Sequence, residues 1–192
     1  DITLTLAFTP SDFVWQGFMQ GKKDGCKEWP IPGESTVSYH GKPIPYMPFV
    51  YQHPEYWHVV EQSSKEHKDL LHSRRLFDDS EAAGLLKEEH MIPVEKIQGR
   101  LLLVGAEDDG LWDTVKYIKR MEQRLQNKTH ACSYAAYIYE HGTHFVFPQT
   151  LLRKIFPVAA DWIVTKCFSA AKQYPVACRA TRMDLDLSLI HI

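Results

Sequence analysis

The stretch RLLLVGAEDDGLWD, residues 100–113, decides the fold. It contains a short apolar run, residues 101–104, which Gly105 closes. A run this short that is apolar at every position is typical of a strand buried on both faces of a parallel sheet. Acidic residues follow directly at 107–109, so the stretch predicts a strand over 100–105 with carboxylates at its carboxyl end.

Elements on both sides extend this strand into a sheet. Downstream, a helix over 113–126 and a strand over 131–139 are predicted, the helix having Asp113 as N-cap and apolar residues at helical spacing, namely Val115, Ile118, Met121 and Leu125. Upstream, the apolar and β-branched residues 2–8 predict another strand. From Pro148 onward helices are predicted, with apolar residues available for a buried face: Leu151, Leu152, Ile155, Ala160, Ile163, Val164 and Phe168. Alternating strands and helices predict an α/β fold, a parallel sheet flanked by helices.

A long insertion, residues 17–89, separates the first two strands. It is rich in Gly and Pro as far as Pro54, and it then predicts helices over 55–77 and 80–89, with Ser80 as N-cap of the second. A loop of this length is uncommon in a compact domain unless it serves as a lid or binding segment. We interpret the insertion as a cap, and a surface excursion without a role in ligand binding is the alternative.

Composition limits the possible functions. With 22 Lys and Arg against 24 Asp and Glu the net charge is −2, so the chain as a whole has no long-range field that would recruit nucleic acid or an anionic membrane. No apolar run reaches the roughly 18 residues that a membrane span needs. The four cysteines lack paired spacing and are interpreted as reduced thiols, so a cytoplasmic protein is expected: Cys26, Cys132, Cys167 and Cys178.

Two strand ends carry groups that could do chemistry. Asp108 and Asp109 follow one predicted strand, and His141 and His144 follow the next. Acid before histidine is the order found in α/β-hydrolases, where the histidine takes a proton from the nucleophile and the carboxylate fixes its tautomer. On spacing alone, solvated loop acids and a surface imidazole explain these residues equally well.

Longer stretches around these residues resemble one family. SYAAYIYEHGTHFVFP, residues 133–148, is similar to the last strand and histidine loop of the acyl-CoA thioesterase and bile acid-CoA:amino acid N-acyltransferase family. IPVEKIQG at 92–99 and LLLVGAEDDGLW at 101–112 resemble the family's acid strand and loop, and PSDFVWQG at 10–17 resembles a segment beyond the nucleophile. The resemblance implies that residues 1–186 are the C-terminal part of an α/β-hydrolase catalytic domain.

The resemblance also implies site residues. The family's acid falls on Asp108 and its base on His144, with Asp109 and His141 as neighbouring alternatives. The family's nucleophile, Ser or Cys in a G-x-S-x-G elbow, is expected upstream of this chain, because Ser133 and Cys132 lie within a strand candidate and Ser11 lacks flanking glycines. The expected function is hydrolysis of acyl thioesters such as acyl-CoA by a triad whose nucleophile is missing from this chain.

Two other functions fit the same residues. Transfer of the acyl group to an amino acid, or a non-catalytic binding module of hydrolase shape, remains open. No HExxH motif or Cys/His set has metal-ligand spacing, so no metal and no cofactor are expected. The last residues, LSLIHI at 187–192, are interpreted as a non-native tail, and residues 179–186 as the lead-in to a closing helix that does not follow.

Overall fold

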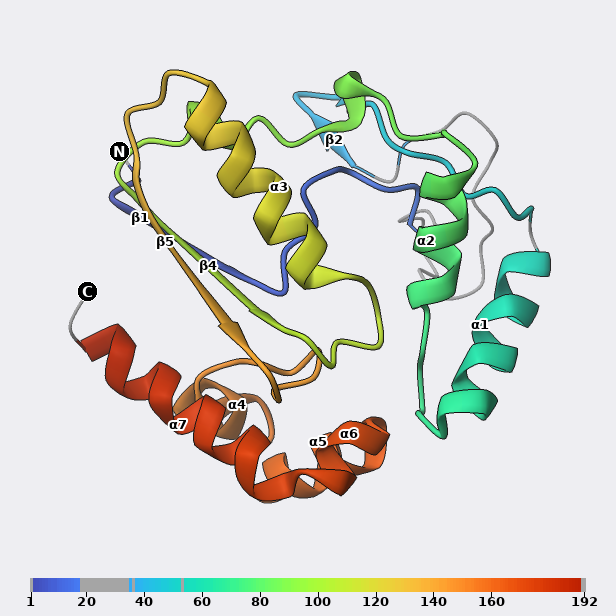
Figure 1. The fold of residues 1–192 in the computed structure, drawn as a ribbon, viewed down its shortest axis with the longest axis vertical. Helices are drawn as coiled ribbons and strands as arrows, with labels where there is room; N and C mark the ends of the chain where they lie inside the picture. Colours follow the sequence, from blue (N-terminus) through green and yellow to red (C-terminus); the bar gives the residue numbers. More distant parts are fainter. Residues whose placement is uncertain (1, 18–34, 36, 53, 191–192) are drawn as a thin grey trace.

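A three-stranded parallel sheet lies at the centre of the computed structural model, which describes residues 2–17, 35, 37–52 and 54–190 (Figure 1). Its strands have the spatial order β1-β4-β5 and are β1 (Leu4–Phe8), β4 (Arg100–Ala106) and β5 (Ser133–Tyr139). Both strand pairs are parallel. The predicted α/β fold with a parallel sheet and flanking helices is therefore confirmed.

The central strand is buried on both faces. Residues 101–106 of β4 are all buried, because β1 and β5 pair along its two edges and helices cover the sheet. Since all three strands run the same way, the segments that follow them meet at one edge of the sheet. Those segments begin at Thr9, Glu107 and Glu140.

Helix α3 (Thr114–Asn127) covers one face of the sheet (Figure 1). Asp113 caps it as predicted, since its carboxylate accepts a hydrogen bond from the Lys116 amide at 3.0 Å. Ile118, Met121 and Leu125 are buried as expected, but Tyr117 takes the place expected for Val115. The reason is that α3 also faces the segment after β1, where Tyr117 packs on Phe13 with ring centroids 5.2 Å apart.

The C-terminal helices cover the opposite face. They are α4 (Gln149–Ile155), α5 (Ala160–Cys167), α6 (Ser169–Gln173) and α7 (Pro175–Ile190). Leu185 of α7 packs on Leu102 and Val104 of β4. Residues 179–186, expected to lead into a helix, lie within α7, and the buried residues in and around them recur at helical spacing: Cys178, Thr181, Arg182 and Leu185. The division at residue 187 stays a prediction.

The cap predicted over 17–89 contains two helices in its described part, α1 (Glu55–His67) and α2 (Arg74–Ala82). The single helix predicted over 55–77 is wrong, because the chain leaves α1 at Lys68 in a left-handed conformation with φ 58°. Ser80 is not an N-cap: its hydroxyl donates to the Leu76 carbonyl inside α2 and accepts from the Val50 amide. Residues 18–34 of the predicted cap lie outside the described residues.

Short elements complete the described chain. β2 (Ser38–Tyr39) pairs antiparallel with β3 (Lys42–Pro43), and two 3-10 helices precede β4, η1 (Glu88–His90) and η2 (Val94–Lys96). Cys132, Cys167 and Cys178 are free thiols, and Cys26 lies outside the described residues. Within the described ranges, no helix combines the length and the apolar character that crossing a membrane requires.

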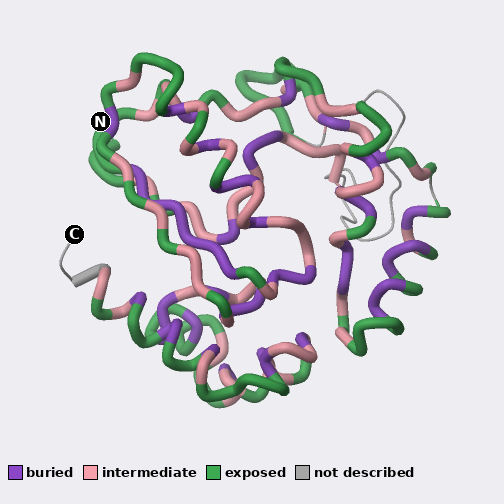
Figure 2. The backbone as a smooth tube through the Cα atoms, viewed as in Figure 1, coloured by how far each residue is buried: buried purple, intermediate pink, exposed green. Residues whose placement is uncertain are grey.

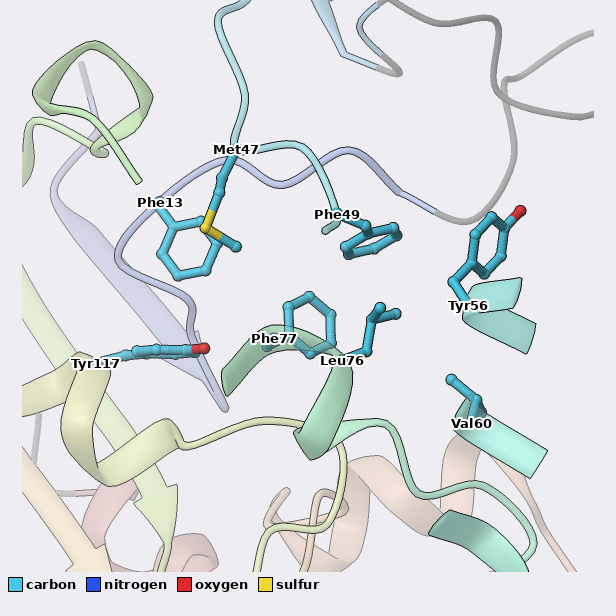
Figure 3. Close-up of a cluster of buried hydrophobic side chains, with 8 residues drawn as sticks. All are labelled: Phe13, Met47, Phe49, Tyr56, Val60, Leu76, Phe77 and Tyr117. Carbon is cyan, nitrogen blue, oxygen red and sulfur yellow. The ribbon is translucent and has the colours of Figure 1, made fainter. Parts of the chain in front are cut away.

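The described part of the 17–89 segment shares a hydrophobic cluster with Phe13 and α3 (Figure 3). Buried side chains from β1's following segment, the Pro-rich segment and three helices meet there: Phe13, Met47, Phe49, Tyr56, Val60, Leu76, Phe77 and Tyr117. Met47 and Phe49 anchor the end of the Pro-rich segment in this cluster, beside side chains of α1 and α2, whereas residues 37–43 are exposed. A role of the segment in ligand binding stays a prediction.

An ion-pair network fastens α3 to the residues before β4. Arg124 donates to both carboxylate oxygens of Glu95, at 2.6 and 2.9 Å, and to Glu88 at 2.7 Å. The hydrogen bonds from Arg124 hold the pKa of Glu95 at about 2, below its usual 4.5. Because the folded pKa is the lower one, the carboxylate contributes stability above pH 4.5 that is lost as the pH falls towards 2.

We predict that Glu95→Gln lowers the free energy of unfolding by about 1.5 kcal/mol at neutral pH, since a hydrogen bond between two charged groups is weakened. Urea unfolding curves should show this difference shrinking as the pH is lowered from about 4.5 to about 2. Glu61→Gln, on the exposed side of α1, is the control and should change the unfolding free energy little at either pH. A loss for Glu95→Gln that is the same in acid would contradict the prediction.

Candidate active site

His144 and Asp109 form a hydrogen-bonded pair beyond the carboxyl ends of β5 and β4. Nδ1 of His144 lies 3.1 and 3.0 Å from the two carboxylate oxygens of Asp109. The Asp109 side chain is 1% exposed, whereas that of His144 keeps 14%. When Nδ1 donates its proton to the carboxylate, Nε2 of His144 is left as a hydrogen-bond acceptor. That is the tautomer a general base requires.

Two further donors fix the Asp109 carboxylate. The Leu111 amide donates to Oδ1 at 2.9 Å, and the Thr114 hydroxyl donates to Oδ2. Thr114 is fully buried at the start of α3 and packs on Gly105, where a Cβ atom would lie 2.5 Å from the Thr114 methyl carbon. A buried carboxylate needs hydrogen bonds to both oxygens, and Asp109 has them from three groups. Its orientation towards His144 is therefore fixed by the fold.

Asp108 contacts His141 and the turn that joins His141 to His144. Its Oδ1 accepts hydrogen bonds from the amides of Gly142 and Thr143 at 3.0 and 2.7 Å, and its Oδ2 lies 3.3 Å from Nδ1 of His141. Thr143 has φ 58°, a left-handed conformation that costs free energy in a β-branched residue. Asp108 thus stabilises the turn from which His144 projects.

Trp112 connects β1 to this edge of the sheet. Its indole Nε1 donates to the Thr9 carbonyl at 3.1 Å, just beyond the end of β1. Its ring meets the His144 ring edge to face, with centroids 4.6 Å apart. Trp112 therefore limits the rotation of the imidazole while Asp109 holds its Nδ1. All three strand ends contribute to the position of His144.

Residues at the start of α2 are hydrogen-bonded to the loop that carries Asp109. The amides of Ser73 and Arg74 donate to the Gly110 carbonyl at 3.1 and 3.2 Å, and the Ser73 hydroxyl donates to the Leu111 carbonyl at 2.8 Å. The Arg74 guanidinium pairs with Asp113 at 2.5 Å. Any movement of the cap relative to the sheet would therefore pull directly on the acid loop.

The expected residues all lie at this edge, but in different pairs from those expected. His144 contacts Asp109, the neighbouring alternative, and Asp108 contacts His141 and the turn. Sequence reasoning missed Thr114, whose hydroxyl completes the Asp109 site. A hydroxyl at the first position of a helix, soon after an acidic loop, was the available signal. Which carboxylate acts in catalysis stays a prediction.

A nucleophile for His144 is not found in the described part of the chain. No serine or cysteine of residues 2–17, 35, 37–52 and 54–190 is hydrogen-bonded to His144. Burial raises the pKa of the Cys167 thiol, and it raises that of Cys178 to about 11, so neither is an activated thiolate. Over the same ranges, no group of three or more His, Cys, Asp or Glu side chains is placed to hold a metal ion.

A parallel sheet with an acid–histidine pair at the ends of adjacent strands defines the C-terminal part of an α/β-hydrolase-like domain. The chain belongs to the family described as BAAT / Acyl-CoA thioester hydrolase C terminal, whose model matches residues 34–151. The matched region contains β4, the acid loop, β5 and His144. Comparisons with curated proteins and with solved structures gave no match.

Proposed function

We propose that this chain supplies the acid and the base of a catalytic triad that cleaves acyl thioesters. The His144–Asp109 pair carries the proposal. Its Nδ1 contact leaves Nε2 available as an acceptor, and the imidazole is partly exposed. In this proposal His144 is the base, and Asp109, in place of the expected Asp108, orients it. Membership of an acyl-CoA thioester hydrolase family supports acyl-CoA as the substrate class.

The proposed reaction has two halves. In the first, Nε2 of His144 takes the proton of the nucleophile, which attacks the thioester carbonyl, and the imidazolium then protonates the departing thiol. Asp109 keeps the other proton on Nδ1 and stabilises the imidazolium. In the second half, His144 takes a proton from water, which attacks the acyl-enzyme, and returns it to the nucleophile as the acid leaves. An amine in place of the water would give an amide.

We infer that the nucleophile and the oxyanion donors come from residues outside this chain. Two observations support this: the described serines and cysteines make no hydrogen bond to His144, and the Cys178 thiol, with its pKa raised to about 11 by burial, is unsuited to the role. In this proposal an upstream strand-to-helix elbow would place such a group beside Nε2 of His144.

The proposal is tested by thiol release from acyl-CoA substrates of several chain lengths. The complete open reading frame should release coenzyme A thiol, whereas the 192-residue chain alone should release none. Turnover by the chain alone would contradict the position of the nucleophile. If the complete protein released no thiol from acyl-CoA of any chain length, the thioesterase function would be contradicted. Adding an amino acid and measuring N-acyl product by mass spectrometry separates transfer from hydrolysis.

A further inference from the structure

The helices after His144 pack around an apolar interior. Buried side chains from all four helical segments form it: Leu152, Ala160, Val164, Phe168, Ala171 and Cys178. Leu151 and Ile155, which the sequence predicts to be buried, are instead exposed. The outer sides of these helices therefore carry apolar residues that do not pack in the interior. Exposed stretches recur along the helices in Figure 2.

The exposed apolar side chains are large and lie on successive helices. Val158, between α4 and α5, is 98% exposed, Trp162 on α5 is 62% exposed, and Val176 on α7 is 81% exposed. On α5, Trp162 lies on the side of the helix opposite to the buried Ala160 and Val164. Val176 and Met183 wall an open, mainly apolar groove of about 410 Å³ between α5 and α7.

The same segment is basic. Residues 149–190, which form these helices, contain six basic residues and three acidic residues, although the whole chain has a net charge of −2. Of the three acidic residues, Asp161 is paired with the buried Arg182 at 2.5 Å, Asp184 accepts a hydrogen bond from the Tyr139 hydroxyl, and Asp186 accepts one from the Thr150 hydroxyl. The other five cations are exposed, and none of the ion pairs found among the described residues involves them: Arg153, Lys154, Lys166, Lys172 and Arg179. Lys166 lies over the Trp162 ring, its Nζ 5.6 Å from the centroid.

Exposed cations beside exposed Trp and aliphatic side chains are the two features of a surface that binds at a lipid headgroup layer. Nucleic acid would use the cations and leave Val158 and Val176 without a partner. We propose that the outer surface of α4 to α7 docks on an anionic phospholipid membrane. Val158, Trp162 and Val176 enter the headgroup region, and the five cations contact lipid phosphates and carboxylates. The total charge does not reveal this surface because acidic residues elsewhere offset it.

The test is co-sedimentation of the chain with phosphatidylcholine vesicles, with and without phosphatidylserine. Binding should require phosphatidylserine and weaken as salt is added. Arg153→Glu combined with Lys166→Glu should lower the partition coefficient at least about tenfold, since each cation near such a surface is worth roughly a fivefold change. Trp162→Ala should also weaken binding, and circular dichroism should show that all variants remain folded.

Matched controls lie on other faces of the molecule. Lys119→Glu on α3 and Val37→Ala before β2 remove an exposed cation and an exposed apolar side chain, and both should bind as the unchanged chain does. His144→Ala should bind vesicles normally, so the result is separate from catalysis. The proposal is overturned by equal binding to both vesicle types, by binding that the helix variants leave unchanged, or by no binding. Preference for duplex DNA, or self-association that Trp162→Ala abolishes, would assign the surface to those partners instead.

Discussion

Replacing His144 with alanine in the complete enzyme should lower kcat for thioester hydrolysis by about 10⁶-fold, the size of effect seen when a triad base is removed. The nucleophile would stay protonated, and the buried Asp109 would lose one of its three donors. Thiol release at saturating acyl-CoA measures the loss, and KM should change far less than kcat, because His144 acts on the reacting groups and not on substrate binding.

His141→Ala is the matched control for this experiment. His141 lies three residues away on the same turn, but its ring faces Asp108 and stacks on Tyr174, with centroids 3.9 Å apart. Its removal should affect stability and lower kcat by no more than about tenfold, since a contact outside the triad only positions the turn. If the His141→Ala enzyme lost its activity and the His144→Ala enzyme kept it, the base would be His141 and not His144.

The sheet could be predicted from the sequence because its signals are local. Residues 101–104 are apolar throughout, so burial on both faces follows from composition alone. Asp113 is a favoured N-cap residue and predicts the start of α3. The cap was harder to predict. Residues 55–77 have helical character throughout, but the turn at Lys68 depends on tertiary hydrogen bonds, such as that from the Leu70 amide to the Cys167 carbonyl, about 100 residues away.

The acid could not be chosen from the sequence for a different reason. Asp108 and Asp109 are adjacent in a tight turn, and neighbouring side chains in a turn point in different directions. The direction of each is set by partners that only the fold brings together, Thr114 for Asp109 and the Gly142 and Thr143 amides for Asp108. The sequence restricted the site to two carboxylates and two imidazoles, and the structure pairs them.

The pairing predicts that two neighbouring substitutions have very different effects. Asp109→Asn in the complete enzyme should lower kcat by about 10⁴-fold if tautomer control resembles that of serine proteases. The Leu111 amide requires the asparagine oxygen at the Oδ1 position, so the new NH₂ group would occupy the Oδ2 position, 3.0 Å from Nδ1 of His144. Nδ1 would then accept a hydrogen bond instead of donating one. The proton would move to Nε2, where it blocks the base.

Asp108→Asn should cost far less, about tenfold or below, because the asparagine oxygen can still accept from the Gly142 and Thr143 amides. Asp108→Ala removes that oxygen and should destabilise the turn, which would appear in the unfolding free energy as well as in kcat. Thiol release and urea unfolding for the three variants decide between the two acids. A 10⁴-fold loss in Asp108→Asn with near-normal Asp109→Asn would return the acid to Asp108. It would also mean that the His144 turn rearranges when the nucleophile is in place, since the pairing seen here could not produce it.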